Sequence, residues 1–530
     1  MSSTTPSTGH PKGLAVLFAT EMWERFNYYG MRAILVLFLT KALLFDKAFA
    51  SNLYGSYTGL VFLTPLLGGY IADRFWGNQR SIILGGLLMA LGEIVLFFCA
   101  SLYSPDKDLS SILFFKELGL ILTVNDVSTT LFFTGLGLMI TGNGFFKPNI
   151  SAMVGQLYPV GDRRIDSAYT IFYMGINVGG AMGPIICGLV GDTGNPADFK
   201  WAFLAGGIAM LISIVVQFAF HRKYVLDPNN KVLGLTPANS PAAWTRPINI
   251  ALFLTVVSAI MIAALYVDTN VVDYLAYVLV ASPLLIGYII FSDKSLSVIE
   301  KQRVAVIFSV SFFVVFFWSA FEQAGASLTF FAEEQTERDL GIFTVPASFF
   351  SSLNSIYVVL FAPLFAWLWL KMGKREPSSP TKMSIGLFLL SLGYLWIAIG
   401  VKDVEAGTKV SIMWLLGMYA LHTWGELCLS PIGLSLVNKL APLKFASLLM
   451  AVWFLASAAA SKLAGVLSAL YPDGRVIYKI FPTDGIKTTQ FMGYQMNNLY
   501  DFFILFVVMS GIAAALLLVL TKLLQKLMNS

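Results

Sequence analysis

The chain has 530 residues, of which 57% are hydrophobic and only 12% are charged, and its formal net charge is +5. Soluble domains carry about twice that charged fraction, so the composition excludes a soluble globular protein. It indicates a polytopic helical membrane protein, whose basic residues reflect topology rather than a nucleic-acid-binding surface. We therefore expect membrane lipid as a partner and no nucleic acid.

The N-terminal segment is polar and lacks the short apolar core and small-residue cleavage site of a signal peptide. The first helix is therefore expected to direct the chain to the membrane. Cys99, Cys187 and Cys428 all lie in apolar segments, so we expect neither a disulfide framework nor a zinc site. No cofactor and no metal are expected.

Apolar runs of helical length recur along the chain and predict fourteen membrane-spanning helices. They cover residues 13–40, 51–73, 81–101, 130–154, 167–190, 201–220, 248–267, 274–292, 304–331, 346–370, 383–401, 410–438, 445–470 and 498–521. An even number of spans places both termini on one side. Lys and Arg are more frequent in the segments on that side, which favours cytoplasmic N- and C-termini. Of the two longer outer segments, residues 102–129 are expected to form an amphipathic interfacial helix.

The polar, proline-containing stretch after His221 predicts a cytoplasmic linker. The two spans that follow contain no Lys, Arg or Glu and resemble an inserted hairpin, which is a poor candidate for the working part. Without them six spans precede and six follow, as in the two-bundle plan of many secondary transporters. The predicted division is an N-terminal six-helix bundle over 13–220, a linker and inserted hairpin over 221–303, and a C-terminal six-helix bundle over 304–526.

The first span carries more charge than a lipid-facing helix tolerates. Each ionisable group in a membrane helix costs roughly 2.5–3.5 kcal/mol by insertion scales, so such groups should face protein or water. At about 100° per residue the polar side chains fall on one stripe, with Glu24 beside it. The stripe comprises Glu21, Arg25, Tyr28, Tyr29 and Arg32. Buried ion pairs that lock helices together are the alternative, but four charges and two tyrosines on one face favour a lined cavity.

Other spans also contain polar groups. Lys147 lies beside Pro148 in a glycine-containing stretch and would be unpaired without a carboxylate, for which Glu21 or Glu24 is the obvious candidate. The remaining polar residues of the spans that we consider for chemistry are Glu322, Glu426, Asn177 and Asn354.

These residue types suit the transport of a zwitterion together with protons. A zwitterionic solute stripped of water needs a cation for its carboxylate and an anion for its amine. Arg32 and Lys147 can supply the first, and Glu426, with the two asparagines, can supply the second. A proton-driven carrier also needs carboxylates whose pKa changes as a counter-ion comes and goes. The candidates are Glu21, Glu24 and Glu322.

Three further ionisable residues lie in spans without an evident role. Glu93 has no partner that the sequence identifies and is expected to make a structural contact. Lys462 is near enough to the outer end of its span to reach the interface. His422 lies one turn before Glu426 and could bond to it, but packing is the favoured role.

The combination of motifs resembles the proton-dependent oligopeptide transporter (POT, or peptide transporter) family of the major facilitator superfamily. The motifs are Glu21-x-x-Glu24-Arg25-Phe26 with Tyr28-Tyr29-Gly30-Met31-Arg32, Phe146-Lys147-Pro148-Asn149, Phe172 to Asn177, Phe317 to Gln323, and Gly425-Glu426-Leu427-Cys428-Leu429-Ser430-Pro431. The loop from Asp73 to Arg80 also looks like the short acidic–basic loop motif of that superfamily.

The resemblance implies an all-α major facilitator fold and the import of di- and tripeptides with protons across the bacterial cytoplasmic (inner) membrane. It assigns to proton coupling Glu21, Glu24, Arg25, Lys147 and Glu322. It assigns to the peptide Tyr28, Tyr29, Arg32, Lys147, Asn177, Asn354, Glu426, Ser430 and Trp453. Within these sets, Arg32 and Lys147 would hold the peptide carboxylate, Glu426 would take the amino end, and Trp453 would close a side-chain pocket. No residue is assigned to catalysis.

The chain departs from the family pattern at three positions. Phe62 stands where a tyrosine is usual, Gly55 stands where animal members have histidine, and Ser355 stands where proline is frequent. Two rival functions stay open. A family relative that carries nitrate or another small anion is disfavoured by Glu426, since such an anion has no amine to meet a buried carboxylate. An integral-membrane enzyme or receptor is disfavoured because no metal triad, activated nucleophile or soluble domain is present in the sequence.

Overall fold

The computed structural model describes residues 9–103, 112–115, 120–159, 161–404, 408–472, 489–491 and 493–529. Some basic residues that the predicted topology places on the outer side lie outside the described residues, namely Lys107, Lys116, Arg475, Lys479 and Lys487.

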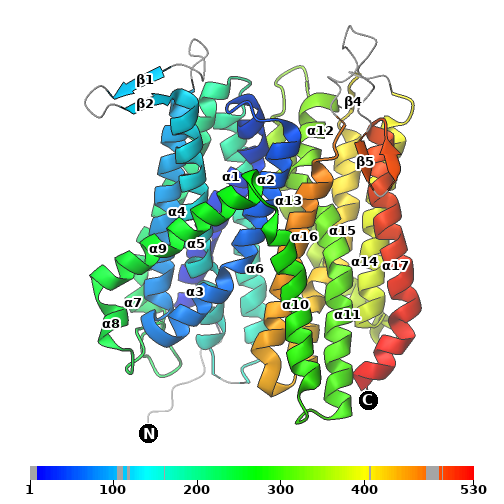
Figure 1. The fold of residues 1–530 in the computed structure, drawn as a ribbon. Helices are drawn as coiled ribbons and strands as arrows, with labels where there is room; N and C mark the ends of the chain where they lie inside the picture. Colours follow the sequence, from blue (N-terminus) through cyan, green and yellow to red (C-terminus); the bar gives the residue numbers. More distant parts are fainter. Residues whose placement is uncertain are drawn as a thin grey trace. The chain divides into compact units, whose positions relative to one another are not determined.

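Each of the predicted spans is helical (Figure 1). The α-helices are α1 (Lys12–Lys41), α2 (Lys47–Leu63), α3 (Pro65–Ile71), α4 (Asn78–Ser101), α5 (Val124–Gln156), α6 (Ile165–Gly191), α7 (Phe199–Tyr224), α8 (Ala242–Thr245), α9 (Pro247–Asn270), α10 (Tyr274–Ser292), α11 (Val298–Phe321), α12 (Ser327–Gln335), α13 (Leu353–Met372), α14 (Ser379–Val401), α15 (Met413–Leu440), α16 (Ala446–Ser468) and α17 (Leu499–Asn529).

Short turns of other helix types interrupt or extend several spans. The predicted span 304–331 is broken by a 3₁₀ turn at Glu322–Gly325, which separates α11 from α12. The predicted span 51–73 is broken at Thr64, between α2 and α3. The remaining short turns are a π-helical turn at Ala72–Trp76 and 3₁₀ turns at Pro196–Asp198, Ala347–Ser352, Gly373–Arg375 and Leu443–Phe445.

Among the described residues, 10 helices or helix series are long and apolar enough to cross a membrane. The other spans are α1, α2, α5 and α15. Of these, α1 contains Glu21, Glu24, Arg25 and Arg32, so its polarity comes from the predicted site itself. The chain is an all-α polytopic membrane protein, as predicted.

The chain folds into two compact units. Unit 1 comprises Met1–Ile34 and Leu63–Leu265, and unit 2 comprises Leu35–Phe62 and Tyr266–Ser530. The division passes through α1 and α9, so each of these helices begins in unit 1 and ends in unit 2. The helix α2 belongs to unit 2, although it comes early in the sequence. The predicted bundle limits at residues 220 and 303 stay a prediction.

Short strands form three two-stranded sheets. They are β1 (Ile112–Phe115), β2 (Leu120–Thr123), β3 (Thr336–Glu337), β4 (Val410–Ser411), β5 (Thr489–Phe491) and β6 (Tyr494–Met496). The pairs β1–β2 and β5–β6 are antiparallel, and β3–β4 is parallel.

The interfacial helix expected within residues 102–129 is wrong for the described part of that segment. The strands β1 and β2 pair there, with Ile112 opposite Thr123. Two short runs of large apolar side chains separated by a few residues favour a hairpin over a helix. Thr123 also caps α5, since its hydroxyl accepts a hydrogen bond from the backbone N–H of Asp126, so that helix begins earlier than predicted.

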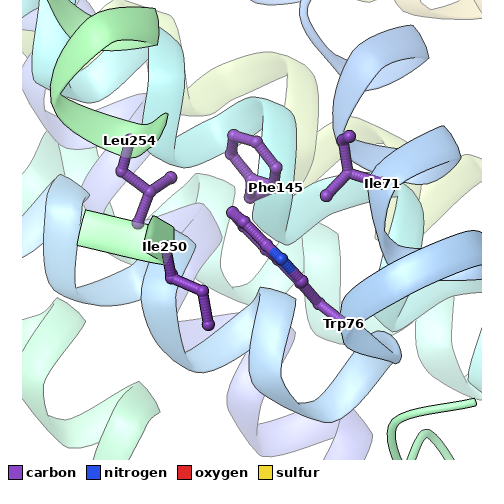
Figure 2. Packing of buried hydrophobic residues seen from close by; sticks show 5 residues of the cluster. All are labelled: Ile71, Trp76, Phe145, Ile250 and Leu254. Carbon is purple, nitrogen blue, oxygen red and sulfur yellow. The ribbon is translucent and has the colours of Figure 1, made fainter. Parts of the chain in front are cut away.

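An apolar cluster in unit 1 ties the inserted segment to the bundle. It comprises Ile71, Trp76, Phe145, Ile250 and Leu254 (Figure 2). The Trp76 ring stacks on Phe145 with centroids 5.2 Å apart, and its Nε1 donates to the backbone oxygen of Trp244 at 2.9 Å. The linker and the N-terminal part of α9, the first helix of the predicted hairpin, are therefore packed parts of unit 1.

Close helix packing in unit 1 depends on glycine where α3 meets α5. A Cβ atom on Gly68 would lie 1.9 Å from the carbonyl oxygen of Gly144, whereas one on Gly69 would lie 3.6 Å from the nearest atom, on Pro148. The first separation is a severe clash with backbone and the second is ordinary contact.

We expect Gly68→Ala to destabilise the protein and Gly69→Ala, its matched control, to leave stability nearly unchanged. Overpacking of a rigid contact typically costs about 1–3 kcal/mol, because the backbone must move. Thermal unfolding of the detergent-solubilised variants measures this difference. Equal melting temperatures for the two variants would show that α3 and α5 separate easily.

Candidate functional site

The polar stripe of α1 contains a buried ion pair in unit 1. Arg25 donates two hydrogen bonds to Glu24, from Nε to Oε2 at 2.5 Å and from Nη2 to Oε1 at 2.6 Å. Asn143 of α5 donates to Glu24 Oε1 at 3.2 Å. The Glu24 side chain is fully buried, so this paired arrangement satisfies a carboxylate that could not stand alone in a membrane.

Glu21 lies one helical turn before Arg25 and joins the same cluster. Its Oε1 is 3.3 Å from Arg25 Nε and also contacts the Lys147 ammonium of α5. Glu21 is therefore one of the two carboxylates predicted to meet Lys147. Its Oε2 has no hydrogen-bond partner within the described part of the chain. The cluster of Glu21, Glu24, Arg25 and Lys147 thus places two acids against two bases.

Two tyrosines extend this cluster along α1. The rings of Tyr28 and Tyr29 meet edge to face, with centroids 5.3 Å apart. The Arg25 guanidinium lies 5.0 Å from the Tyr28 ring centroid, and that of Arg32 lies 6.0 Å from the Tyr29 centroid. These distances are within the range of cation–π attraction. The two rings lie about one turn after Arg25, and Arg32 lies about two turns after it. The rings therefore link the ion-pair cluster to Arg32.

Asn177 of α6 is also in unit 1. It is buried, and its Nδ2 donates to the backbone oxygen of Tyr173 in the preceding turn.

In unit 2 the central polar group is Glu426 of α15. Asn354 of α13 donates from Nδ2 to Glu426 Oε2 at 2.7 Å and to Thr423 Oγ1 at 3.3 Å. Glu426 is buried, and no Lys or Arg of the described residues forms an ion pair with it. Glu426 and Asn354, which were predicted to act together, are therefore in direct contact.

The other predicted residues of unit 2 lie on neighbouring elements. Glu322 is buried at the turn after α11. Ser430 follows Glu426 by one turn of α15 and is partly exposed. The Trp453 ring of α16 packs on Gly433, where a Cβ would lie 1.9 Å from it. The ring thus lies directly against α15, the helix that carries Glu426.

The structure identifies partners that the sequence could not. Glu93 of α4 accepts a hydrogen bond from Asn27 of α1 at 2.7 Å, which is the structural contact expected for it. The expectation for Lys462 is wrong: the lysine is buried and pairs with Asp268 and Asp273. Both partners come from a segment far away in sequence, and they satisfy the ammonium group inside the protein in place of water.

His422 of α15 packs as favoured from the sequence. Its ring lies 4.7 Å from that of Tyr394, and its Nε2 has no hydrogen-bond partner among the described residues. Within the same residues, no group of three or more His, Cys, Asp or Glu side chains has an arrangement that could hold a metal ion.

Gly55 has a packing role in unit 2. A Cβ on this residue would lie 2.7 Å from the Cα of Gly465, so α2 and α16 touch through backbone at this point. A histidine at this position would force the two helices apart. The absence of a side chain at Gly55 therefore allows the close approach of α2 and α16.

Comparisons with known proteins identify the family. The sequence model of the POT family (PTR2) matches residues 79–485. An uncharacterised transporter of Bacillus subtilis, YclF, is 36% identical over 474 residues, which cover 87% of this chain and 88% of the relative. A di-/tripeptide transporter of Lactococcus lactis is 30% identical over 498 residues, covering 90% and 93%.

The crystal structure of a POT family transporter in complex with 5-aminolevulinic acid is also similar. It superposes with a TM-score of 0.76 at 29% identity, over 98% of this chain and 97% of that one. The fold is therefore that of a major facilitator transporter with fourteen membrane-spanning helices, and the protein is a multi-pass membrane transporter rather than an enzyme. The chain belongs to the POT family.

Proposed function

We propose that this chain is a proton-coupled symporter that imports di- and tripeptides across the bacterial cytoplasmic membrane by alternating access, with both termini cytoplasmic. The observation that carries the proposal is the buried Glu426, which Asn354 holds and no basic side chain of the described residues neutralises. A buried carboxylate without a cation is costly, and the ammonium group of a peptide would relieve that cost.

Unit 1 would bind the other end of the peptide, its carboxylate. Arg32 and Lys147 supply cations for the peptide carboxylate, with Tyr28 and Tyr29 beside them. On the amino side, Asn177 and Asn354 would assist Glu426, and Ser430 and Trp453 would line the side-chain pocket. A carrier of nitrate or another small anion would use the cations but has no use for Glu426. The POT relative that binds 5-aminolevulinic acid, a ligand with an amine and a carboxylate, supports the zwitterion.

Proton coupling would use the acids of the α1 cluster together with Glu322. Glu21 has one oxygen without a hydrogen-bond partner among the described residues, and its other oxygen is shared by Arg25 and Lys147. Loss of either basic partner would favour protonation of this carboxylate, and return of the partner would favour release. We propose that Arg32 alternates between Glu322 and the peptide carboxylate, so that Glu322 holds its proton while the peptide occupies Arg32.

Uptake into proteoliposomes tests the proposal. Labelled dialanine should accumulate under an inwardly directed proton gradient, and an uncoupler should abolish the accumulation. Excess unlabelled dialanine should compete with the label, whereas excess nitrate should not. Competition by nitrate alone would favour the anion carrier, and a protein that accumulates nothing would favour a receptor or an enzyme.

Glu322→Gln should lose accumulation against a gradient while it still exchanges dipeptide across the membrane. Glutamine keeps the shape of the side chain but cannot bind and release a proton, so the coupling step fails while binding survives. Uptake and counterflow of dialanine measure the two activities. Glu337→Gln, an exposed residue of β3, is the control. Full proton-driven accumulation by Glu322→Gln would refute the proposed switch.

A further inference from the structure

The last turn of α9 and its connection to α10 carry the only charged residues of those two helices and their connection, Asp268 and Asp273. Both meet the ammonium group of Lys462 of α16, at 2.8 Å from Asp268 Oδ2 and 3.0 Å from Asp273 Oδ1. The side chain of Asp268 is 0% exposed and that of Lys462 is 5% exposed. A segment otherwise free of charge thus directs both of its acids at one buried lysine.

Ser56 of α2 completes the cluster. Lys462 Nζ donates to Ser56 Oγ at 2.8 Å, and Ser56 Oγ donates to Asp268 Oδ2 at 2.7 Å. The other oxygen of Asp268 accepts the backbone N–H of Leu275 at 2.7 Å. An ammonium group has three N–H donors, and here each has an acceptor. The ammonium group is therefore fully satisfied, by acceptors from α2, the last turn of α9 and the α9–α10 connection.

This cluster lies on a close seam between α2 and α16. The two helices touch through Gly55 and Gly465, and Ser51 Oγ lies 3.0 Å from Ser468 Oγ. The seam joins an early helix of the sequence to a late one within unit 2. Alternating access requires segments of the two halves of the sequence to separate and rejoin during each cycle.

Separation of α2 from α16 would remove Ser56 from Lys462. An ammonium group without a counter-ion is costly in a membrane, so the opening would meet a large barrier unless another partner stayed with it. Asp268 and Asp273 can stay, because α10 packs against α16.

We propose that the inserted hairpin supplies a standing counter-ion for Lys462, so that the α2–α16 seam opens and closes without leaving a buried cation unpaired. The hairpin is then a working part of the gate. This inference rests on the proposed transport function, because it assumes that the seam opens during the cycle.

A charge-removal cycle tests the proposal. Asp268→Asn and Lys462→Met should each lower dialanine uptake by roughly tenfold or more, because each leaves a buried charge with an incomplete partner set. The double variant should recover to within about threefold of the parent, because no buried charge remains without its partner. A double variant as defective as the single ones would overturn the counter-ion role.

A second measurement follows the seam itself. Cysteines replace Ser51 and Ser468 in a chain whose native cysteines are changed to alanine, and disulfide formation is timed in proteoliposomes with and without dialanine. The substrate should change the rate in the parent and in the double variant but not in either single variant. Single variants that still respond to dialanine would overturn the proposal.

A matched control uses the opposite ends of the same helices. Asp293, just after α10, pairs with Lys444, just before α16, at 2.5 Å, and the Lys444 side chain is 57% exposed. The hydrogen bond from Lys444 lowers the pKa of Asp293, so this ion pair is formed at neutral pH. Asp293→Asn and Lys444→Met should leave uptake within about threefold of the parent, since exposed pairs contribute little.

The two proposals fail in different ways. A parent protein that takes up no dialanine would overturn the proposed function, and this inference with it. A parent that transports dialanine, together with single variants that transport equally well, would overturn this inference alone.

Discussion

Lys147→Ala is expected to abolish the proton-driven accumulation of dipeptide. The substitution leaves Glu21 with Arg25 as its remaining partner, and that arginine is already bound through two hydrogen bonds to Glu24. Removal of one member of a buried ion pair typically costs about 3–5 kcal/mol, because the other charge stays buried. We expect this variant to lose coupling to the proton gradient, because Glu21 no longer has a second basic partner to exchange during the cycle.

A second variant separates coupling from folding. Lys147→Ala combined with Glu21→Gln leaves no carboxylate without a partner, so thermal stability should recover while accumulation stays absent. Lys444→Ala, a change of an exposed lysine, is the control and should accumulate dialanine normally. The measurements are uptake under a proton gradient and thermal unfolding of each variant. Accumulation at the parent level by Lys147→Ala would contradict the proposed cluster.

Glu426→Gln is expected to lose the recognition of the peptide amino group. Glutamine can still accept the hydrogen bond from Asn354, so the contact between α13 and α15 should remain. Truncation of one partner of a buried, hydrogen-bonded charge pair costs about 2–5 kcal/mol, which corresponds to a loss in affinity of roughly thirtyfold or more. The lost partner here would be the ammonium group of the substrate.

A pair of ligands makes this prediction specific. Dialanine should stabilise the parent against heat far more than N-acetyl-dialanine does, because acetylation removes the positive charge. The Glu426→Gln variant should distinguish little between the two ligands, whereas Glu337→Gln should behave as the parent. A variant that still prefers dialanine as strongly as the parent would show that Glu426 does not bind the amino end.

Most of the fold follows from local pattern. Long apolar runs predicted each helix of membrane-spanning length that the structure shows, because the hydrocarbon core of a membrane imposes both length and composition on a span. The segment that contains β1 and β2 was an exception. It lies in one of the longer outer segments, where that constraint is absent and the pairing of two short strands decides the structure.

For the site as well, the sequence predicted one part and the tertiary structure decided another. The cost of burying charge marked Glu21, Glu24, Arg25 and Lys147 as candidates. Their contact depends on the tertiary packing that brings Lys147 of α5 to Glu21 of α1. The sequence could not distinguish Glu21 from Glu24 as the partner of Lys147. The structure shows that Glu24 is taken by Arg25, which leaves Glu21 for the lysine.

The sequence by itself determined that this is a helical membrane protein, where its spans lie, and which of their residues are too polar for lipid. Tertiary structure alone decided that Asp268 and Asp273 meet Lys462, that Asn27 meets Glu93, and that α2 packs in unit 2. The physical reason is that hydrophobicity and helical period act over neighbouring residues, whereas the partner of a buried charge is chosen by which distant helices come into contact.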